Sequence, residues 1–234
     1  MEGAHEGNGL ARFHCRVKPP LFWQIAKAIG HIARAAMPQQ LPFAAIGVKN
    51  AQQHPQRPQP IVRWHPFQLN PDMASEGMSR ADYVQAKFGP RAGTVYDRVK
   101  AVGASLDIPF EFDKIARQPN TRAAHSLIAL AEPGPQQEAV VQTLFDAYFI
   151  EGQDLTQTSV LVALAQRAGL DPAQAQQALG DEEVIAQISE ADQQARAMGV
   201  QGVPFFIFNG RVGVSGAHES EDLLRAMENA EAEA

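Results

Sequence analysis

The sequence predicts an α/β protein in which a long block of helices interrupts a small sheet. Two strand-like stretches indicate the sheet: residues 61–64, which alternate in polarity, and residues 205–214, which contain a tight-turn signal. Between them, apolar residues recur at spacings of three and four, the period of amphipathic helices. With 234 residues, 45% of them hydrophobic and 20% charged, the chain can bury a full core.

The first predicted strand is Ile61–Trp64, which His65-Pro66 ends because the residue before a proline favours extended or turn geometry. The helical block follows. Ser79, with Asp82 three residues later, is an N-cap candidate for a helix that stops at Gly89-Pro90. In the last helix of the block, which Asp181 begins, we expect these residues to face inward: Val184, Ile188, Ala191, Ala195 and Met198.

Residues 205–214 predict a β-hairpin. Phe205 to Phe208 form a short apolar run, and Asn209-Gly210 is the dipeptide that most readily adopts the two positive φ angles of a type I′ turn. Pro204 stands where the first strand begins, a position at which its missing N–H costs no ladder bond, and either peptide isomer fits there. A closing helix over residues 219–230 should bury Leu223, Leu224 and Met227.

Three motifs carry a resemblance to a known family. They are Arg63-Trp64-His65-Pro66-Phe67-Gln68-Leu69-Asn70-Pro71, Pro119-Asn120-Thr121, and Gly202-Val203-Pro204-Phe205-Phe206-Ile207-Phe208-Asn209-Gly210 with Ser215-Gly216-Ala217. In these motifs the chain resembles the DsbA-like branch of the thioredoxin superfamily, in particular the FrnE-like oxidoreductases. Those enzymes are related to 2-hydroxychromene-2-carboxylate isomerases and kappa-class glutathione transferases. The resemblance extends from about residue 61 to about residue 228.

The resemblance implies a thioredoxin-like sheet with an inserted all-helical domain. Residues 61–76 and 184–234 would form the thioredoxin-like domain, and residues 77–183 the helical insertion. In residues 1–60 the first strand and helix of that fold are replaced by atypical sequence, which we expect to be poorly ordered. That segment has no Ser or Thr, and residues 37–60 contain six Gln and five Pro, a composition that disfavours packed structure.

The resemblance also implies a substrate-binding site. In the family a cis proline faces the redox cysteines, and the residue before it pairs with the substrate chain. Gly202, Val203 and Pro204 would therefore hold an extended thiol or disulfide substrate, and we expect a cis Val203–Pro204 bond. Asn120 and Ser215 match family positions near the pocket in which the related enzymes hold glutathione. Asn120 is equally well explained as a helix N-cap, and Ser215 as the end of the hairpin.

The chemistry of the family requires thiols that this chain lacks. Cys15 is the single cysteine, so no Cys-x-x-Cys pair and no internal disulfide can form, and the catalytic residues stay unassigned. Three function classes remain: a DsbA/FrnE-type thiol–disulfide oxidoreductase, a glutathione-dependent isomerase or transferase with glutathione as co-substrate, and a redox-dead peptide-binding protein. The serine at a helix start that the second class uses is also absent from residues 1–60.

Charge divides the chain at the same boundary. Residues 1–60 carry +5 and the remainder −11 of the net −6. The histidines of the basic segment match no ligand spacing, so we predict no metal site. We hypothesise that residues 1–59 arise from a shifted reading frame or a misassigned start, and that the native product carries the strand and the Cys-x-x-Cys helix there. The DNA upstream of codon 61, read in the other two frames, would test this.

The partners follow from the same composition. An acidic body argues against nucleic-acid binding, and no apolar run approaches the roughly 18 residues that cross a bilayer. An export signal begins with a basic region that is followed by an apolar stretch, and the first residues show neither. We therefore expect a cytoplasmic protein. Its expected partners are a protein with thiols or a disulfide, or a small thiol, and a homodimer is compatible with the sequence.

Overall fold

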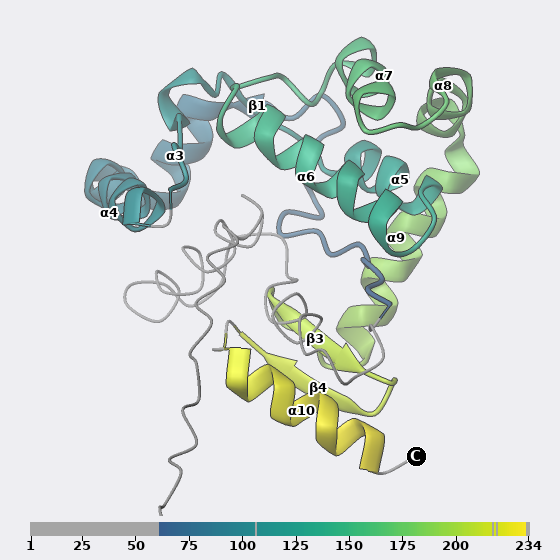
Figure 1. Ribbon diagram of the computed structural model, residues 1–234. Coiled ribbons are helices and arrows are strands. Elements are labelled where there is room, and N and C mark those ends of the chain that lie inside the picture. The colour runs from purple at the N-terminus through teal and green to yellow at the C-terminus, as the bar shows by residue number, and fades with distance from the viewer. Residues whose placement is uncertain (1–60, 106, 217, 219, 233–234) are drawn as a thin grey trace, which may run out of the picture.

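The computed structural model describes residues 61–232, apart from 106, 217 and 219. A block of helices lies at one end of the molecule and a β-hairpin backed by the last helix at the other, with helix α9 running between them (Figure 1). The helices are α3 (Arg80–Phe88), α4 (Ala92–Ser105), α5 (Arg122–Leu130), α6 (Pro135–Phe149), α7 (Thr158–Arg167), α8 (Pro172–Gly180), α9 (Glu182–Ala197) and α10 (Ser220–Ala232), with short 3-10 turns η1 (Gly89–Arg91) and η2 (Phe112–Lys114).

The strands form two separate antiparallel pairs. β3 (Phe205–Phe208) pairs with β4 (Val212–Ser215), with Phe205 opposite Ser215. Asn209 and Gly210 have φ angles of 50° and 69°, so the two positive φ angles predicted for this turn are confirmed. Phe208 lies opposite Val212, so the loop also contains Arg211 and is one residue longer than a two-residue type I′ connection. β1 (Met78–Ser79) pairs with β2 (Arg117–Gln118) inside the block expected to be all-helical, which therefore contains one short strand pair.

Local capping signals were predicted well. Ser79 accepts a hydrogen bond from the Asp82 N–H at 3.0 Å, and α3 ends before Gly89, as expected. Asp181 caps α9 by accepting from the N–H groups of Glu183 and Val184. The inward stripe of α9 is confirmed at Ile188, which is buried, but it is wrong for Met198, whose side chain is 68% exposed. Met198 is the C-cap residue, and there the chain turns away to reach Val200.

The predicted strand at Ile61–Trp64 is wrong. Among the described residues this segment has no neighbouring strand, and a strand without a ladder partner does not form. The segment instead lies on the start of α6. The Val62 carbonyl accepts from the Gly134 N–H at 3.0 Å, and the Trp64 N–H donates to the Gln137 side chain at 2.7 Å. Trp64 is thus part of the helical core rather than of a sheet.

Two hydrophobic cores result. The larger one lies in the helical block and centres on α5, α6 and α7, where Leu127, Val140 and Leu161 are almost completely buried. The smaller one lies between the hairpin and α10, where Phe206 and Phe208 cover Leu223. Burial of one such side chain contributes about 1.5–3 kcal/mol to the free energy of unfolding, so these contacts favour the packing of α10 against the hairpin.

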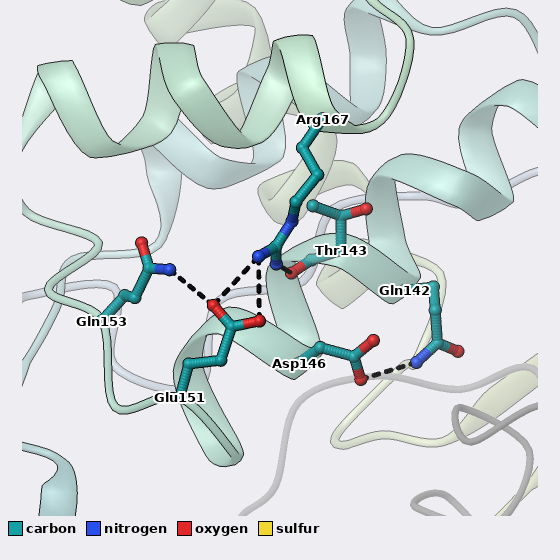
Figure 2. A network of polar contacts seen from close by, with 6 residues as sticks. All are labelled: Gln142, Thr143, Asp146, Glu151, Gln153 and Arg167. Carbon is teal, nitrogen blue, oxygen red and sulfur yellow. Dashed lines mark hydrogen bonds and ion pairs between the residues drawn. The ribbon is translucent and has the colours of Figure 1, made fainter.

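A polar network fastens the end of α6 to α7 (Figure 2). Arg167 donates to both carboxylate oxygens of Glu151, at 2.8 and 3.0 Å, and to the Thr143 carbonyl at 3.1 Å. Gln142 donates to Asp146 at 2.8 Å, and burial raises the pKa of the Asp146 carboxyl. This pair orients the loop after α6. Because Arg167 and Glu151 are both partly exposed, the ion pair adds only about 0–1 kcal/mol to the free energy of unfolding.

Candidate functional site

The predicted substrate loop lies between α9 and the hairpin. The Val200 N–H donates back to the Ala195 carbonyl at 3.0 Å and ends the helix, after which residues 201–204 lead into β3. The Val203–Pro204 peptide bond is cis. Pro204 is buried, and its carbonyl accepts from the Gly216 N–H at 2.8 Å, which fixes the loop to the end of β4.

Val203 offers unused backbone groups at this position. Within the described part of the chain, neither its N–H nor its C=O has a hydrogen-bond partner, although the residue is half-buried. Backbone groups that are partly shielded from water and unpaired gain from a new partner. An extended chain that lies alongside Val203 can supply both a carbonyl and an N–H, as a neighbouring strand does.

Ser215 lies beside this loop. It is the last residue of β4 and pairs with Phe205, the residue after Pro204. Its carbonyl is 2.9 Å from Nε2 of His218. The structure therefore brings Gly202, Val203, Pro204 and Ser215 together at one end of the hairpin.

Asn120 is placed differently. It is buried at the start of α5, where its Nδ2 donates to the Met73 carbonyl at 2.5 Å and its Oδ1 accepts from the Arg122 N–H at 2.9 Å. The N-cap position of α5 is occupied by Thr121 and not by Asn120, but the Thr121 side chain makes no capping bond. Asn120 caps the helix from one position earlier, through its bond to the Arg122 N–H. None of the hydrogen bonds of Asn120 within the described residues reaches the loop at Val203.

The segment that carries the Arg63–Pro71 motif is tied to α9 by a buried acid. The Gln68 N–H donates to Oδ1 of Asp192 at 2.6 Å, and Arg196 donates to Oδ2 of Asp192 at 2.9 Å and also to the Gln68 carbonyl. The Arg196 guanidinium covers the Phe67 ring at 4.4 Å. Because α9 leads into the substrate loop, this clamp fixes the loop relative to the helical block. Sequence reasoning missed it, although Asp192 and Arg196 have the spacing of a helical ion pair.

A cavity lies in the helical block, between α3 and α4 on one side and α5 and α6 on the other. Its free volume is about 110 Å³. The basic side chains that line it, Arg80 and Lys87, were not predicted as site residues. Their spacing with Tyr83 on one face of α3 is the only sequence signal for this site, and helices carry such faces for many reasons.

Across the described residues, no three His, Cys, Asp or Glu side chains gather in a way that could hold a metal ion. No described helix combines the length and apolarity that a membrane crossing requires. Cys15 and the rest of the atypical 1–60 segment, which we expected to be poorly ordered, lie outside the described residues.

This architecture is shared with known proteins. A family model for the DsbA-like thioredoxin domain matches residues 42–228. The match starts inside the 1–60 segment, ahead of the position at which the motif resemblance begins. No curated protein matches the chain significantly.

The solved structures that are similar over most of the chain include an oxidoreductase and two isomerases. A probable DsbA oxidoreductase from Streptomyces coelicolor has 24% sequence identity and a TM-score of 0.68, covering 90% of this chain and 88% of its own. A 2-hydroxychromene-2-carboxylate isomerase has 15% identity and a TM-score of 0.50, covering 92% and 90%. A candidate protein disulfide isomerase from Nitrosomonas europaea has 13% identity and a TM-score of 0.52, covering 92% and 93%.

At these identities the structural matches establish the fold, which is the thioredoxin-like DsbA fold with its helical block. The family match covers most of the chain and includes both the Arg63–Pro71 motif and the Pro204 loop. This chain therefore belongs to the family of proteins with a DsbA-like thioredoxin domain.

Proposed function

We propose that this chain works on thiol or disulfide substrates in the manner of the DsbA/FrnE-like oxidoreductases, and that its described part is the substrate-binding half of such a site. The loop at Val203 and Pro204 binds an extended segment of a cysteine-containing protein. Gly202 and Ser215 border that segment.

The observation that carries the proposal is the pair of backbone groups at Val203 that have no hydrogen-bond partner among the described residues. They belong to a loop whose two ends are fixed by hydrogen bonds to α9 and β4. A peptide can therefore pair with them without rearrangement of the loop. Because backbone pairing ignores side-chain identity, such a site accepts many sequences, which suits a protein that acts on cysteines in different substrates.

The cysteine count limits the chemistry of one chain. A dithiol–disulfide cycle passes through a mixed disulfide and needs two thiols, whereas this chain has only Cys15. We therefore propose that the chain binds its substrate and that the second thiol in any exchange comes from another molecule, such as glutathione.

The test is peptide binding by the full chain. A fluorescein-labelled, extended peptide with one alkylated cysteine is titrated by fluorescence anisotropy, together with a series in which each backbone nitrogen is methylated in turn. One hydrogen bond is worth about 0.5–1.5 kcal/mol, so methylation at the paired position should weaken binding about 2- to 12-fold. Methylation of the two neighbouring positions, whose N–H groups point away from Val203, serves as the control.

Two further arms separate the function classes. The Cys15→Ser variant should bind the peptide as the wild type does, and insulin reduction by the chain alone should be absent. A glutathione-dependent isomerase or transferase instead predicts that glutathione displaces the peptide at millimolar or lower concentration. Absence of peptide binding, or equal effects of methylation at every position, would refute the proposed site.

A further inference from the structure

The cavity in the helical block is apolar over most of its wall. Its carbon-rich lining comes from α4, α5 and α6 and from the turn η2. The side chains Val95, Val99, Phe112, Ile128, Leu144 and Phe149 make up much of that lining. A cavity with an apolar lining of this kind can hold a small apolar group. For comparison, an engineered apolar cavity of about 150 Å³ binds benzene.

Arg80 brings unused hydrogen-bond donors to this cavity. One guanidinium nitrogen donates to Oε1 of Gln118 at 2.5 Å and another to the Tyr96 hydroxyl at 2.7 Å. The guanidinium also lies over the Tyr96 ring, at 5.1 Å from its centroid. A guanidinium has five N–H groups, so three of them have no partner within the described residues.

Lys87 adds a second positive charge two turns further along α3. Its ammonium group donates to the Tyr83 hydroxyl and lies 4.7 Å from the Tyr83 ring centroid. An ammonium has three N–H groups, and the other two have no acceptor among the described residues. Burial and the charge of Arg80 together lower the pKa of Lys87 to about 8.

Among the described residues, no carboxylate compensates these two charges. In the part of the chain that the structure describes, neither Arg80 nor Lys87 takes part in an ion pair, although the partly exposed Lys100 of α4 pairs with Asp113. Partial burial of two cations with unpaired N–H groups at one cavity costs desolvation free energy. A bound anion offsets this cost because it pairs with both charges. The acceptors that are present, Gln118 and the tyrosine hydroxyls, are neutral and cannot balance the charge.

We propose that this cavity binds a small organic monoanion, with its carboxylate held by Arg80 and Lys87 and its apolar body among the α4, α5 and α6 side chains. The volume of about 110 Å³ suits a body of roughly six carbons, somewhat smaller than the benzene-binding model cavity. This site is separate from the backbone groups of Val203 and does not depend on the function proposed for them.

The probe pair is hexanoate and hexanamide, which have the same carbon chain and differ in charge. Each is titrated into the full chain by isothermal calorimetry at pH 7, with ligand-detected saturation-transfer NMR as a second readout. Because charge-assisted hydrogen bonds are about twice as strong as neutral ones, hexanoate should bind at least about tenfold more tightly than hexanamide.

Three variants and one control variant locate the site. Arg80→Gln and Lys87→Gln should each weaken hexanoate binding about tenfold and leave hexanamide binding unchanged. Lys100→Gln is the matched control, because this lysine does not line the cavity, and its hexanoate affinity should equal that of the wild type. Ala124→Leu fills the cavity and should abolish binding of both ligands while both cations remain.

Circular dichroism and thermal unfolding show whether each variant is folded. If Arg80→Gln does not fold, Lys87→Gln and Ala124→Leu still test the proposal. Equal affinity for acid and amide would overturn the proposal, as would hexanoate binding that survives in both Lys87→Gln and Ala124→Leu. Failure of both ligands to bind the wild type would overturn it as well. The peptide titration at Val203 is unaffected by any of these results, so the two proposals fail independently.

Discussion

The backbone N–H of Gln68 donates to the carboxylate of Asp192 at 2.6 Å, across 124 residues of sequence. The acid is almost completely buried, and Arg196 compensates its charge from the next turn of α9. This contact joins the segment with the Arg63–Pro71 motif to the helix that leads into the Pro204 loop.

Replacement of Asp192 by Ala should therefore be costly. It leaves the Gln68 N–H buried without a partner and removes the counter-charge of Arg196, so we expect the free energy of unfolding to fall by about 2–4 kcal/mol. Urea unfolding followed by circular dichroism measures this. Asp113→Ala removes an exposed acid whose partner is Lys100 and should leave the unfolding midpoint almost unchanged.

The same substitution should have opposite effects at two glycines of α4. A Cβ on Gly103 would lie 2.5 Å from the ring of Phe110, so Gly103→Ala forces α4 away from this ring and should destabilise the protein by about 1–3 kcal/mol. Gly93 has open space around it, and Gly93→Ala should stabilise the helix by up to about 1 kcal/mol. Thermal unfolding of both variants checks the sign of each effect.

Asn120 should act as a structural residue at the start of α5. Asn120→Ala removes the bonds to the Met73 carbonyl and the Arg122 N–H and should cost about 1–2 kcal/mol of stability. Thr121→Ala is the adjacent control, since the Thr121 side chain makes no capping bond. If Asn120→Ala instead weakens peptide or glutathione binding and leaves stability unchanged, Asn120 is a ligand contact and not a structural residue.

Binding of hexanoate should weaken as the pH rises through about 8. Lys87 has a pKa lowered to about 8 by burial, so the free protein loses this charge above that pH, whereas the ligand is ionised throughout the range above about pH 6. The other titratable groups that line the cavity are Arg80, Tyr83, Tyr96 and Tyr148. Burial raises the pKa of each tyrosine, so these phenols stay neutral. A guanidinium carries its charge at every pH in this range.

Calorimetry between pH 6 and 9.5 tests this expectation. The wild type should show constant affinity up to about pH 7.5 and a several-fold loss above it. In Lys87→Gln the affinity should be lower and independent of pH over the same range. A pH profile that is the same in both proteins would assign the titration to a different group.

Features set by neighbouring residues were predictable from the sequence. Ser79, Asp181 and the Asn209-Gly210 turn act through bonds or φ angles within a few residues, and the structure has each of them as predicted. The cis form of the Val203–Pro204 bond was expected only through the family resemblance, since local chemistry allows both isomers.

Features that need distant partners were not predictable. Ile61–Trp64 has the alternation of a strand, but strand formation depends on a neighbour, and here the segment bonds to Gly134 and Gln137 instead. The cavity brings Arg80 together with Gln118 and with Tyr148 of α6, residues whose proximity no spacing in the sequence indicates. The proposed domain boundary at residues 183 and 184 remains a prediction and would fall in the first turn of α9.

The most direct test of the account is the backbone amide of Val203 itself. In a ¹⁵N-labelled full chain, titration with the extended peptide should shift the Val203 amide proton downfield and slow its exchange with solvent at least about tenfold, because the amide gains a hydrogen-bond partner. The amide of Gly213, on β4 and away from the loop, provides the reference. Saturating peptide binding that leaves the shift and exchange rate of the Val203 amide unchanged would contradict the account.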